Sequence, residues 1–339
     1  MNPSDEMRFD LRDNGGNLAG CEWIAAEGVI TDTTADNLRA FLDSFGHTHN
    51  PGRPAIRFHS PGGSLSGGIK LGELVRQLKF DTEVGQSQPD EYGHWRRAPG
   101  FCASACSFAF LGGLHRSVSA GEFGVHQFYN ELSLRDPFAK LFSALDVSHH
   151  QLVSAMLIDY VYRMGVDPRL VSLASSVLPE QMHFLAEEEL NDLKVRWHPK
   201  EFQPWSIVPM GGGIAAATHS RDRTRFAHFL YREDGVPTLL ITNTEPHLTQ
   251  ERLDTAVKDI ASVEAFGLVF PSSALNVRFK DNVLALEYSL KGVDSLIVET
   301  SRQRLVGVDG PRYILNTFSY LMPEQNAKIA IDLAAKNPV

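Results

Sequence analysis

The sequence is poor in cysteine and has no long apolar run. Its 339 residues include 3 cysteines, too few for a disulfide framework. No stretch of about 18 apolar residues occurs, so we expect no transmembrane helix. The opening residues, MNPSDEMRFDLRD, have neither a basic nor an apolar segment typical of a signal peptide. As written, the chain is therefore expected to be cytoplasmic, or periplasmic if a leader has been removed.

An excess of positive charge is also lacking. Lys and Arg number 32 against 41 Asp and Glu, giving a formal net charge of −9. This balance argues against nucleic acid or an anionic membrane surface as the main partner. A hydrophobic content of 43% is enough to bury a sizeable core, and at roughly 150 residues per domain the length predicts two domains.

The first half of the chain alternates strand and helix patterns. Residues 55–58 predict a strand that turns sharply at SPGG into an apolar helix ending near residue 78, and residues 80–84 predict the next strand. Residues 22–30 and 34–45 predict an earlier strand and helix. Strands joined through covering helices indicate an α/β fold with a parallel sheet.

The glycine turn after residue 58 has several interpretations. Glycines at such turns often serve only a backbone that needs positive φ. A phosphate loop is excluded, because Lys70 is preceded by Ile69 and followed by Leu71, which breaks the G-x-x-x-x-G-K-[ST] pattern. The third interpretation is that the unshielded N–H groups of Gly62 or Gly63 bind a developing oxyanion.

Residues 99–128, PGFCASACSFAFLGGLHRSVSAGEFGVHQF, contain a candidate nucleophile and base. Ser104 precedes a short apolar helix, and an apolar strand over 123–125 leads to His126. Unpaired N–H groups and the dipole at a helix start favour the negative charge that forms when a serine attacks a carbonyl. His126 would then act as the base. The alternative is that Ser104 is only a helix cap.

Cys102 and Cys106 flank Ser104 four residues apart. A metal site would need further ligands at similar spacing, and the sequence offers none, so no metal is expected. The pair is expected to be small buried packing residues or, alternatively, a redox-sensitive pair that reshapes the turn at Ser104.

The motifs HSPGGSLSGG, CASAC and GVHQ, in this order, resemble the ClpP-like serine peptidases of the ClpP/crotonase superfamily, over residues 20–196. The closest resemblance is to bacterial ClpP-like proteins with a CASAC-type nucleophile turn. It implies a spiral of ββα units, Ser104 as nucleophile and His126 as general base. The oxyanion hole would use N–H groups of Gly62 or Gly63 and of Ala105. No cofactor is expected for this chemistry.

The third catalytic group is less evident. The resemblance implies an aspartate after a long helix, but that position falls near Met182, which cannot orient an imidazole. Glu180 is the nearest carboxylate and the candidate orienting acid, with Ser175, Ser176 and Gln181 as neutral candidates. Without any of them the site would operate as a Ser–His dyad.

Residues 85–101 form a longer link than the resembled proteins have before the nucleophile. Such a loop is expected to be either a lid beside Ser104 or a mobile insertion. The side chains that would face a ligand are Tyr92, Trp95, Arg96 and Arg97.

A long helix is expected over residues 137–164. Its apolar positions cover more than one stripe, which favours burial within the monomer or, as the resemblance implies, packing between subunits.

After residue 197 the composition changes, and prolines and glycines mark a boundary. We expect a catalytic domain over 1–200 and a β-rich (α+β) accessory domain over 205–339. Tight turns at Asp234-Gly235 and at 280–282 predict hairpins. Expected strands cover 214–220, 225–232, 236–243, 266–271, 276–280, 283–290 and 294–301, and expected helices cover 248–263 and 323–336. The task of this domain could be regulation, substrate gathering or assembly.

Three functions follow from these patterns. The first is a serine peptidase that hydrolyses peptides or unfolded protein. The second is a non-catalytic binding or scaffold protein with the same fold, and the third is a crotonase-like acyl-CoA enzyme. The resemblance also implies a homo-oligomer, and an ATP-dependent unfoldase as a partner is unproven.

Overall fold

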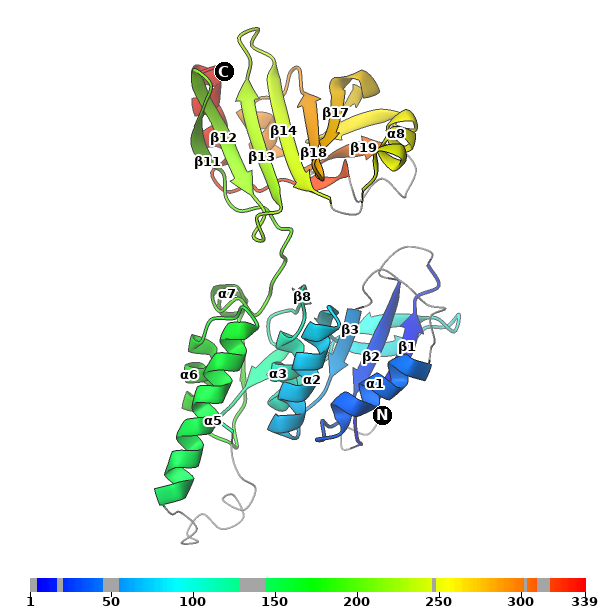
Figure 1. Ribbon diagram of the computed structural model, residues 1–339, viewed down its shortest axis with the longest axis vertical. Helices are drawn as coiled ribbons and strands as arrows, with labels where there is room; N and C mark the ends of the chain where they lie inside the picture. The colour runs from blue at the N-terminus through cyan, green and yellow to red at the C-terminus, as the bar shows by residue number, and fades with distance from the viewer. Residues whose placement is uncertain are drawn as a thin grey trace. The chain divides into compact units, whose positions relative to one another are not determined.

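The computed structural model divides the chain into two compact units, Met1–His198 and Pro199–Val339, called unit 1 and unit 2 (Figure 1). The structure describes residues 5–16, 21–44, 55–128, 144–245, 248–301, 304–309 and 318–339. Each unit has a hydrophobic core of its own. Within the described ranges, no helix is both long and apolar enough to cross a membrane.

Unit 1 is built on a mixed five-stranded sheet in the order β1-β2-β3-β4-β8. β1 runs antiparallel to β2, and the remaining neighbours are parallel. The parallel part confirms the α/β class expected from the alternating strand and helix patterns. The strands are β1 (Arg8–Asp13), β2 (Glu22–Glu27), β3 (Ala55–His59), β4 (Asp81–Val84) and β8 (Arg116–Ser117).

A second sheet of three short strands has the order β10-β9-β7, comprising β7 (Cys102–Ala103), β9 (Phe123–Val125) and β10 (His183–Phe184). β7 and β9 are parallel, whereas β10 is antiparallel to β9. The two sheets join at Ser60, whose N–H donates to Phe101 O at 2.9 Å and whose carbonyl accepts from Ala103 N at 3.0 Å. This junction brings the end of β3 beside β7.

Six described helices accompany these sheets, and α1 and α2 lie side by side (Figure 1). Their bounds are α1 (Thr34–Ser44), α2 (Leu65–Gln77), α3 (Ala105–Leu111), α5 (Ala144–Arg163), α6 (Arg169–Ser176) and α7 (Glu187–Asp192). Ser64 caps α2 by accepting a hydrogen bond from Gly67 N at 3.1 Å. The helix expected over 137–164 is observed from residue 144, and 137–143 lie outside the described residues.

Helix α5 has both a buried and an exposed apolar face. Leu157, Tyr160 and Val161 are buried in the core of unit 1. Four further apolar side chains of α5 are exposed, namely Leu152, Met156, Ile158 and Tyr162. Burial within the monomer therefore accounts for only part of the apolar character of this helix.

Glycines set the distance between α2 and α3. An added Cβ on Gly68 would lie 2.3 Å from the Ala105 carbonyl oxygen, and one on Gly112 would lie 2.2 Å from the Gly72 carbonyl oxygen. Both distances are far below van der Waals contact, so the two backbones touch directly. Because α3 begins immediately after Ser104, this contact fixes the position of the Ser104 turn.

Buried Arg116 ties together three parts of unit 1. Its guanidinium donates to the carbonyl oxygens of Gly113, Met164, Lys194 and Val195 at 2.8–3.1 Å. Burial lowers its pKa to about 9, so the group stays charged at neutral pH. The end of α5 is thereby attached to the segment after α3.

Residues 85–101 contain a β-hairpin of β5 (Gln86–Pro89) and β6 (Trp95–Ala98). The guanidinium carbon of Arg12 on β1 lies 3.7 Å from the ring centroid of Trp95, and Trp23 on β2 donates to Ser87 at 2.9 Å. Arg97 pairs with Glu122 at 2.8 Å. The segment expected to be a lid or a mobile insertion is therefore anchored to β1 and β2.

Unit 2 contains two antiparallel sheets, of six strands in the order β11-β12-β13-β14-β18-β17 and of four in the order β16-β15-β19-β20. Its core includes Trp205, Phe229 and Tyr288. The strands are β11 (Ser206–Met210), β12 (Gly213–His219), β13 (Arg225–Tyr231), β14 (Pro237–Thr244), β15 (Ser262–Ala265), β16 (Leu268–Pro271), β17 (Leu275–Lys280), β18 (Val283–Ser289), β19 (Leu305–Asp309) and β20 (Tyr320–Leu321). The helices are α8 (Gln250–Lys258), α9 (Ser295–Thr300) and α11 (Ala327–Lys336), beside a short 3₁₀ turn, η2 (Ser272–Ala274).

One strand expected in unit 2 is wrong. Most of the segment 294–301 is helix α9 (Ser295–Thr300), because the Asp294 side chain accepts from Ile297 N at 2.9 Å and caps a helical turn. The hairpin turn between β17 and β18 is present, with Asp281 and Asn282 at φ of 50° and 62°. Two consecutive residues with positive φ are typical of a type I′ hairpin.

We predict that Gly68→Ala destabilises the chain by about 1–3 kcal/mol, as expected for overpacking against a backbone atom. A helix interior otherwise favours alanine over glycine by ~1 kcal/mol, so a loss of stability reports the contact with Ala105. The melting temperature should fall by about 2–10 °C. Gly212→Ala is the matched control, because Gly212 has no atom within 4 Å of an added Cβ. Equal melting temperatures for the two variants would contradict the close α2–α3 contact.

Candidate functional site

Ser104 occupies a strained turn between β7 and α3. Its φ of 56° and ψ of −123° place it in a region that costs a non-glycine residue about 1–3 kcal/mol. The residue is the N-cap of α3, yet its side chain makes no capping hydrogen bond. The interpretation of Ser104 as only a helix cap is therefore wrong, and its hydroxyl is available for other contacts.

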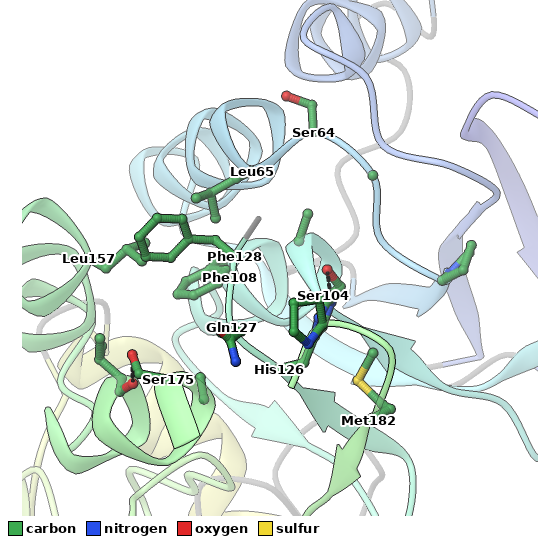
Figure 2. Close-up of a pocket in the computed structure, with 16 residues that line it drawn as sticks. Ser64, Leu65, Ser104, Phe108, His126, Gln127, Phe128, Leu157, Ser175 and Met182 are labelled. Carbon is green, nitrogen blue, oxygen red and sulfur yellow. Dashed lines mark hydrogen bonds between the residues drawn. The ribbon is translucent and has the colours of Figure 1, made fainter. Parts of the chain in front are cut away.

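The hydroxyl of Ser104 meets His126. The Ser104 Oγ and the His126 Nε2 are 2.7 Å apart (Figure 2). β7 and β9 are adjacent parallel strands with Ala103 opposite Gly124, so the residues just beyond their carboxyl ends lie together. Burial lowers the pKa of His126, which keeps the imidazole neutral at neutral pH and able to accept a proton.

The two glycines after Pro61 have different roles. Gly62, at φ 108°, donates its N–H to Ser60 Oγ at 3.1 Å, and an added Cβ would lie 2.7 Å from the Ser104 Cβ. Gly62 thus permits close approach rather than offering a free donor. Gly63, at φ 133°, and Ala105 both line the cavity beside Ser104, and neither N–H has a hydrogen-bond acceptor among the described residues.

A cavity of about 450 Å³ opens beside the Ser104–His126 pair. Phe108, Phe128 and Leu157 gather on one side of it, whereas Met182 lies on the other, near His126 (Figure 2). The volume falls in the range of small-ligand and substrate sites. The complete lining is Pro61, Gly63, Ser64, Leu65, Ser104, Ala105, Phe108, His126, Gln127, Phe128, Leu157, Val171, Ala174, Ser175, Pro179 and Met182.

None of the residues expected to orient the His126 imidazole forms a hydrogen bond with it among the contacts of the described residues. Glu180 is exposed in a turn after α6, and it forms no hydrogen bond or ion pair with any residue that the structure describes. Ser175 lines the cavity but donates to Val171 O at 2.8 Å, and Ser176 donates to Leu173 O at 2.7 Å. Gln181 does not belong to the cavity lining.

The hairpin β5–β6 supports the site from outside. Tyr92, Trp95, Arg96 and Arg97 do not line the cavity, so the lid interpretation is not what the structure has. Instead, Gln86 Nε2 lies 2.8 Å from His59 Nε2, and the His59 ring packs edge-on against Phe101 at 4.6 Å. These contacts hold the residues before Ser60 against the strand that leads to Ser104.

Cys102 and Cys106 form a disulfide with their Cα atoms 5.2 Å apart. Both are fully buried, as expected, but they are covalently joined rather than only packed. Their spacing of four residues was the one sign of this pairing in the sequence. In the described parts of the chain, no group of three metal-ligating side chains is found.

Comparisons with known proteins do not assign the chain to a family. No protein-family model matches the chain, and no curated protein matches it. Among solved structures, a mutant of ClpP1 from Listeria monocytogenes is similar at 14% sequence identity, with a TM-score of 0.30. The match covers 50% of this chain and 84% of that chain. At this TM-score the likeness is too weak to establish a shared fold.

We predict that the reactivity of Ser104 toward a fluorophosphonate falls as the pH drops, with a midpoint below the ordinary histidine pKa of about 6.5. Burial lowers the pKa of His126, so the neutral base persists to lower pH and is lost on protonation. The labelling rate measured between pH 4.5 and 9 checks this. A midpoint above 7 would contradict the assigned environment of His126.

We also predict that Glu180→Gln leaves the labelling rate of Ser104 within about twofold of the wild type, because Glu180 is exposed and pairs with none of the residues that the structure describes. The matched control is Glu188→Gln, an exposed carboxylate in α7. A loss of the size typical for an orienting acid, about 10⁴-fold, would instead assign Glu180 to the catalytic group.

Proposed function

We propose that unit 1 is a ClpP/crotonase-type catalytic domain that hydrolyses peptide bonds in peptides or unfolded protein. The observation that carries this proposal is the 2.7 Å contact between Ser104 Oγ and His126 Nε2, beside the N–H groups of Gly63 and Ala105, which have no acceptor in the described part of the chain. The motif order SPGG, CASAC and HQ supports it, and so do the parallel strands whose ends present these residues.

The reaction would start with attack of Ser104 Oγ on the substrate carbonyl carbon, while His126 Nε2 accepts the hydroxyl proton. The carbonyl oxygen gains the negative charge, which the N–H groups of Gly63 and Ala105 stabilise. The imidazolium then donates its proton to the leaving amine nitrogen, and an acyl-enzyme remains. Water attacks this ester with His126 as base, which releases the acid and restores Ser104. These steps use only groups of the chain and water.

The cavity suggests an apolar substrate side chain next to the scissile bond. Phe108, Leu157 and Val171 form part of its wall, and Leu157 and Val171 are buried. An apolar side chain would gain burial there, at about 25 cal/mol for each Å² of apolar surface removed from water.

A second candidate function is a binding or scaffold protein with the same fold. Two observations favour it. Glu180, the nearest carboxylate expected from the sequence, is exposed and does not line the cavity, whereas Met182, an apolar side chain, lines it near His126. Loss of an orienting acid typically costs orders of magnitude in rate, so the chain would then bind peptides and release them unchanged.

Partners would follow from the same proposal. The four exposed apolar side chains of α5 are consistent with a homo-oligomer in which this face is covered. An ATP-dependent unfoldase would be needed only if folded proteins are substrates. Unit 2, with a core of its own, would act in substrate gathering, assembly or regulation.

The decisive experiment is fluorophosphonate labelling of the full chain with mass spectrometry to locate the adduct. We expect an adduct on Ser104 that is absent in Ser104→Ala and forms about 10²–10⁴-fold more slowly in His126→Ala. Ser66→Ala is the matched control, because Ser66 is an exposed serine of α2 that does not line the cavity. The rates at which the wild type and the variants hydrolyse a fluorogenic peptide library should follow the same order as their labelling rates.

The absence of any adduct, with all variants folded and the probe active on a control hydrolase, would overturn the peptidase proposal. Peptide binding without turnover, measured by fluorescence anisotropy, would then establish the scaffold alternative.

A further inference from the structure

The Cys102–Cys106 disulfide closes a five-residue ring whose middle residue is Ser104. Cys102 belongs to β7, and Cys106 lies in the first turn of α3. The covalent link therefore joins the strand before Ser104 to the helix after it.

Hydrogen bonds hold the ring on both its strand side and its helix side. Cys102 N donates to Glu122 O at 2.8 Å, Ala103 N to Ser60 O at 3.0 Å, and Ser104 N to Gly124 O at 3.0 Å. On the helix side, Ser107 N donates to Ser104 O at 3.0 Å, the Ser107 hydroxyl contacts Gly124 O at 2.6 Å and Cys102 O at 3.3 Å, and Ala105 N has no acceptor among the residues described. The disulfide is the covalent link across Ser104, beside the single hydrogen-bond contact of Ser107 with Cys102.

Two features indicate that this bond does more than stabilise the folded chain as a whole. In the chain-entropy account, stabilisation by a disulfide grows with the length of the closed loop, and this loop is very short. Both cysteines are completely buried within an already packed core. Locally, the bond joins the two ends of the short segment in which Ser104 has positive φ.

We propose that Cys102 and Cys106 are positioning residues for Ser104, and that their disulfide holds the serine hydroxyl toward His126 and the Ala105 N–H toward the cavity. The reactivity of Ser104 then depends on the oxidation state of this pair. This inference rests on the proposed function for its effect on reactivity, whereas its effect on the backbone is independent of it.

Reduction would be carried out by a dithiol reagent. The reagent gives up two electrons and two protons, the S–S bond breaks, both sulfur atoms become thiols, and the reagent closes its own disulfide. Because both sulfur atoms are buried, we expect this reaction to be slow in the native chain. A double variant, Cys102→Ala/Cys106→Ala, gives the unlinked state directly.

The first measurement is hydrogen exchange of the full chain, followed by mass spectrometry of peptides covering residues 99–112. In the double variant we expect exchange in this segment to rise tenfold or more, with exchange in unit 2 unchanged. Cys21→Ala is the matched control, because Cys21 is the free cysteine. Unchanged exchange in residues 99–112 of the double variant would overturn the positioning role.

The second measurement is the rate of fluorophosphonate labelling at Ser104, recorded together with the melting temperature and the pH midpoint. We expect the double variant to label at least tenfold more slowly at a temperature where it is fully folded, with the His126 midpoint unmoved. Dithiothreitol should lower the wild-type rate in step with the fraction reduced, and reoxidation should restore it. Labelling at the wild-type rate in the double variant would overturn the proposed dependence of Ser104 reactivity on the disulfide. No labelling of any form would overturn the proposed function, and the exchange data would still decide the positioning role.

Discussion

The arrangement of unit 1 depends on how closely Gly62 and Ser104 approach each other. A Cβ on Gly62 would lie 2.7 Å from the Ser104 Cβ and 2.8 Å from the Ala103 carbonyl oxygen, so only glycine fits. Both residues have positive φ, and such conformations persist only where their surroundings hold them. The hydrogen bonds from Ser60 N to Phe101 O and from Ala103 N to Ser60 O supply that support. As a result, the Ser104 hydroxyl lies at the same cavity as the N–H groups of Gly63 and Ala105, for which the described ranges offer no acceptor.

The cavity draws on unit 1 alone, since every residue that lines it precedes His198. Unit 2 has its own buried aromatic core, including Trp205, whose Nε1 donates to Pro323 O at 2.9 Å. The residues that line the cavity and the core of unit 2 therefore belong to different compact units.

The sequence was informative wherever a local pattern determines the geometry. Ser104 and His126 follow two apolar segments that pair as parallel strands, so their proximity could be anticipated. The hydrogen bond from Gly62 N to Ser60 Oγ could not be anticipated, because it depends on the orientation of one peptide plane. Residues 294–301 are rich in Ile, Val and Leu and resemble a strand, but the cap supplied by Asp294 makes them a helix. The disulfide could not be derived from the spacing of four residues, because that spacing does not show that Cys102 lies in a strand and Cys106 in the helix after it.

The cavity is assembled from segments that are far apart in the chain, which has a consequence for synthesis on the ribosome. The serine and histidine are separated by only 22 residues, but the wall beside them comes from α6 and from Met182, just before β10. β10 completes its sheet by pairing with β9. Contacts between distant segments form late in folding. A nascent chain therefore contains Ser104 and His126 before the segments that complete the cavity wall have been synthesised.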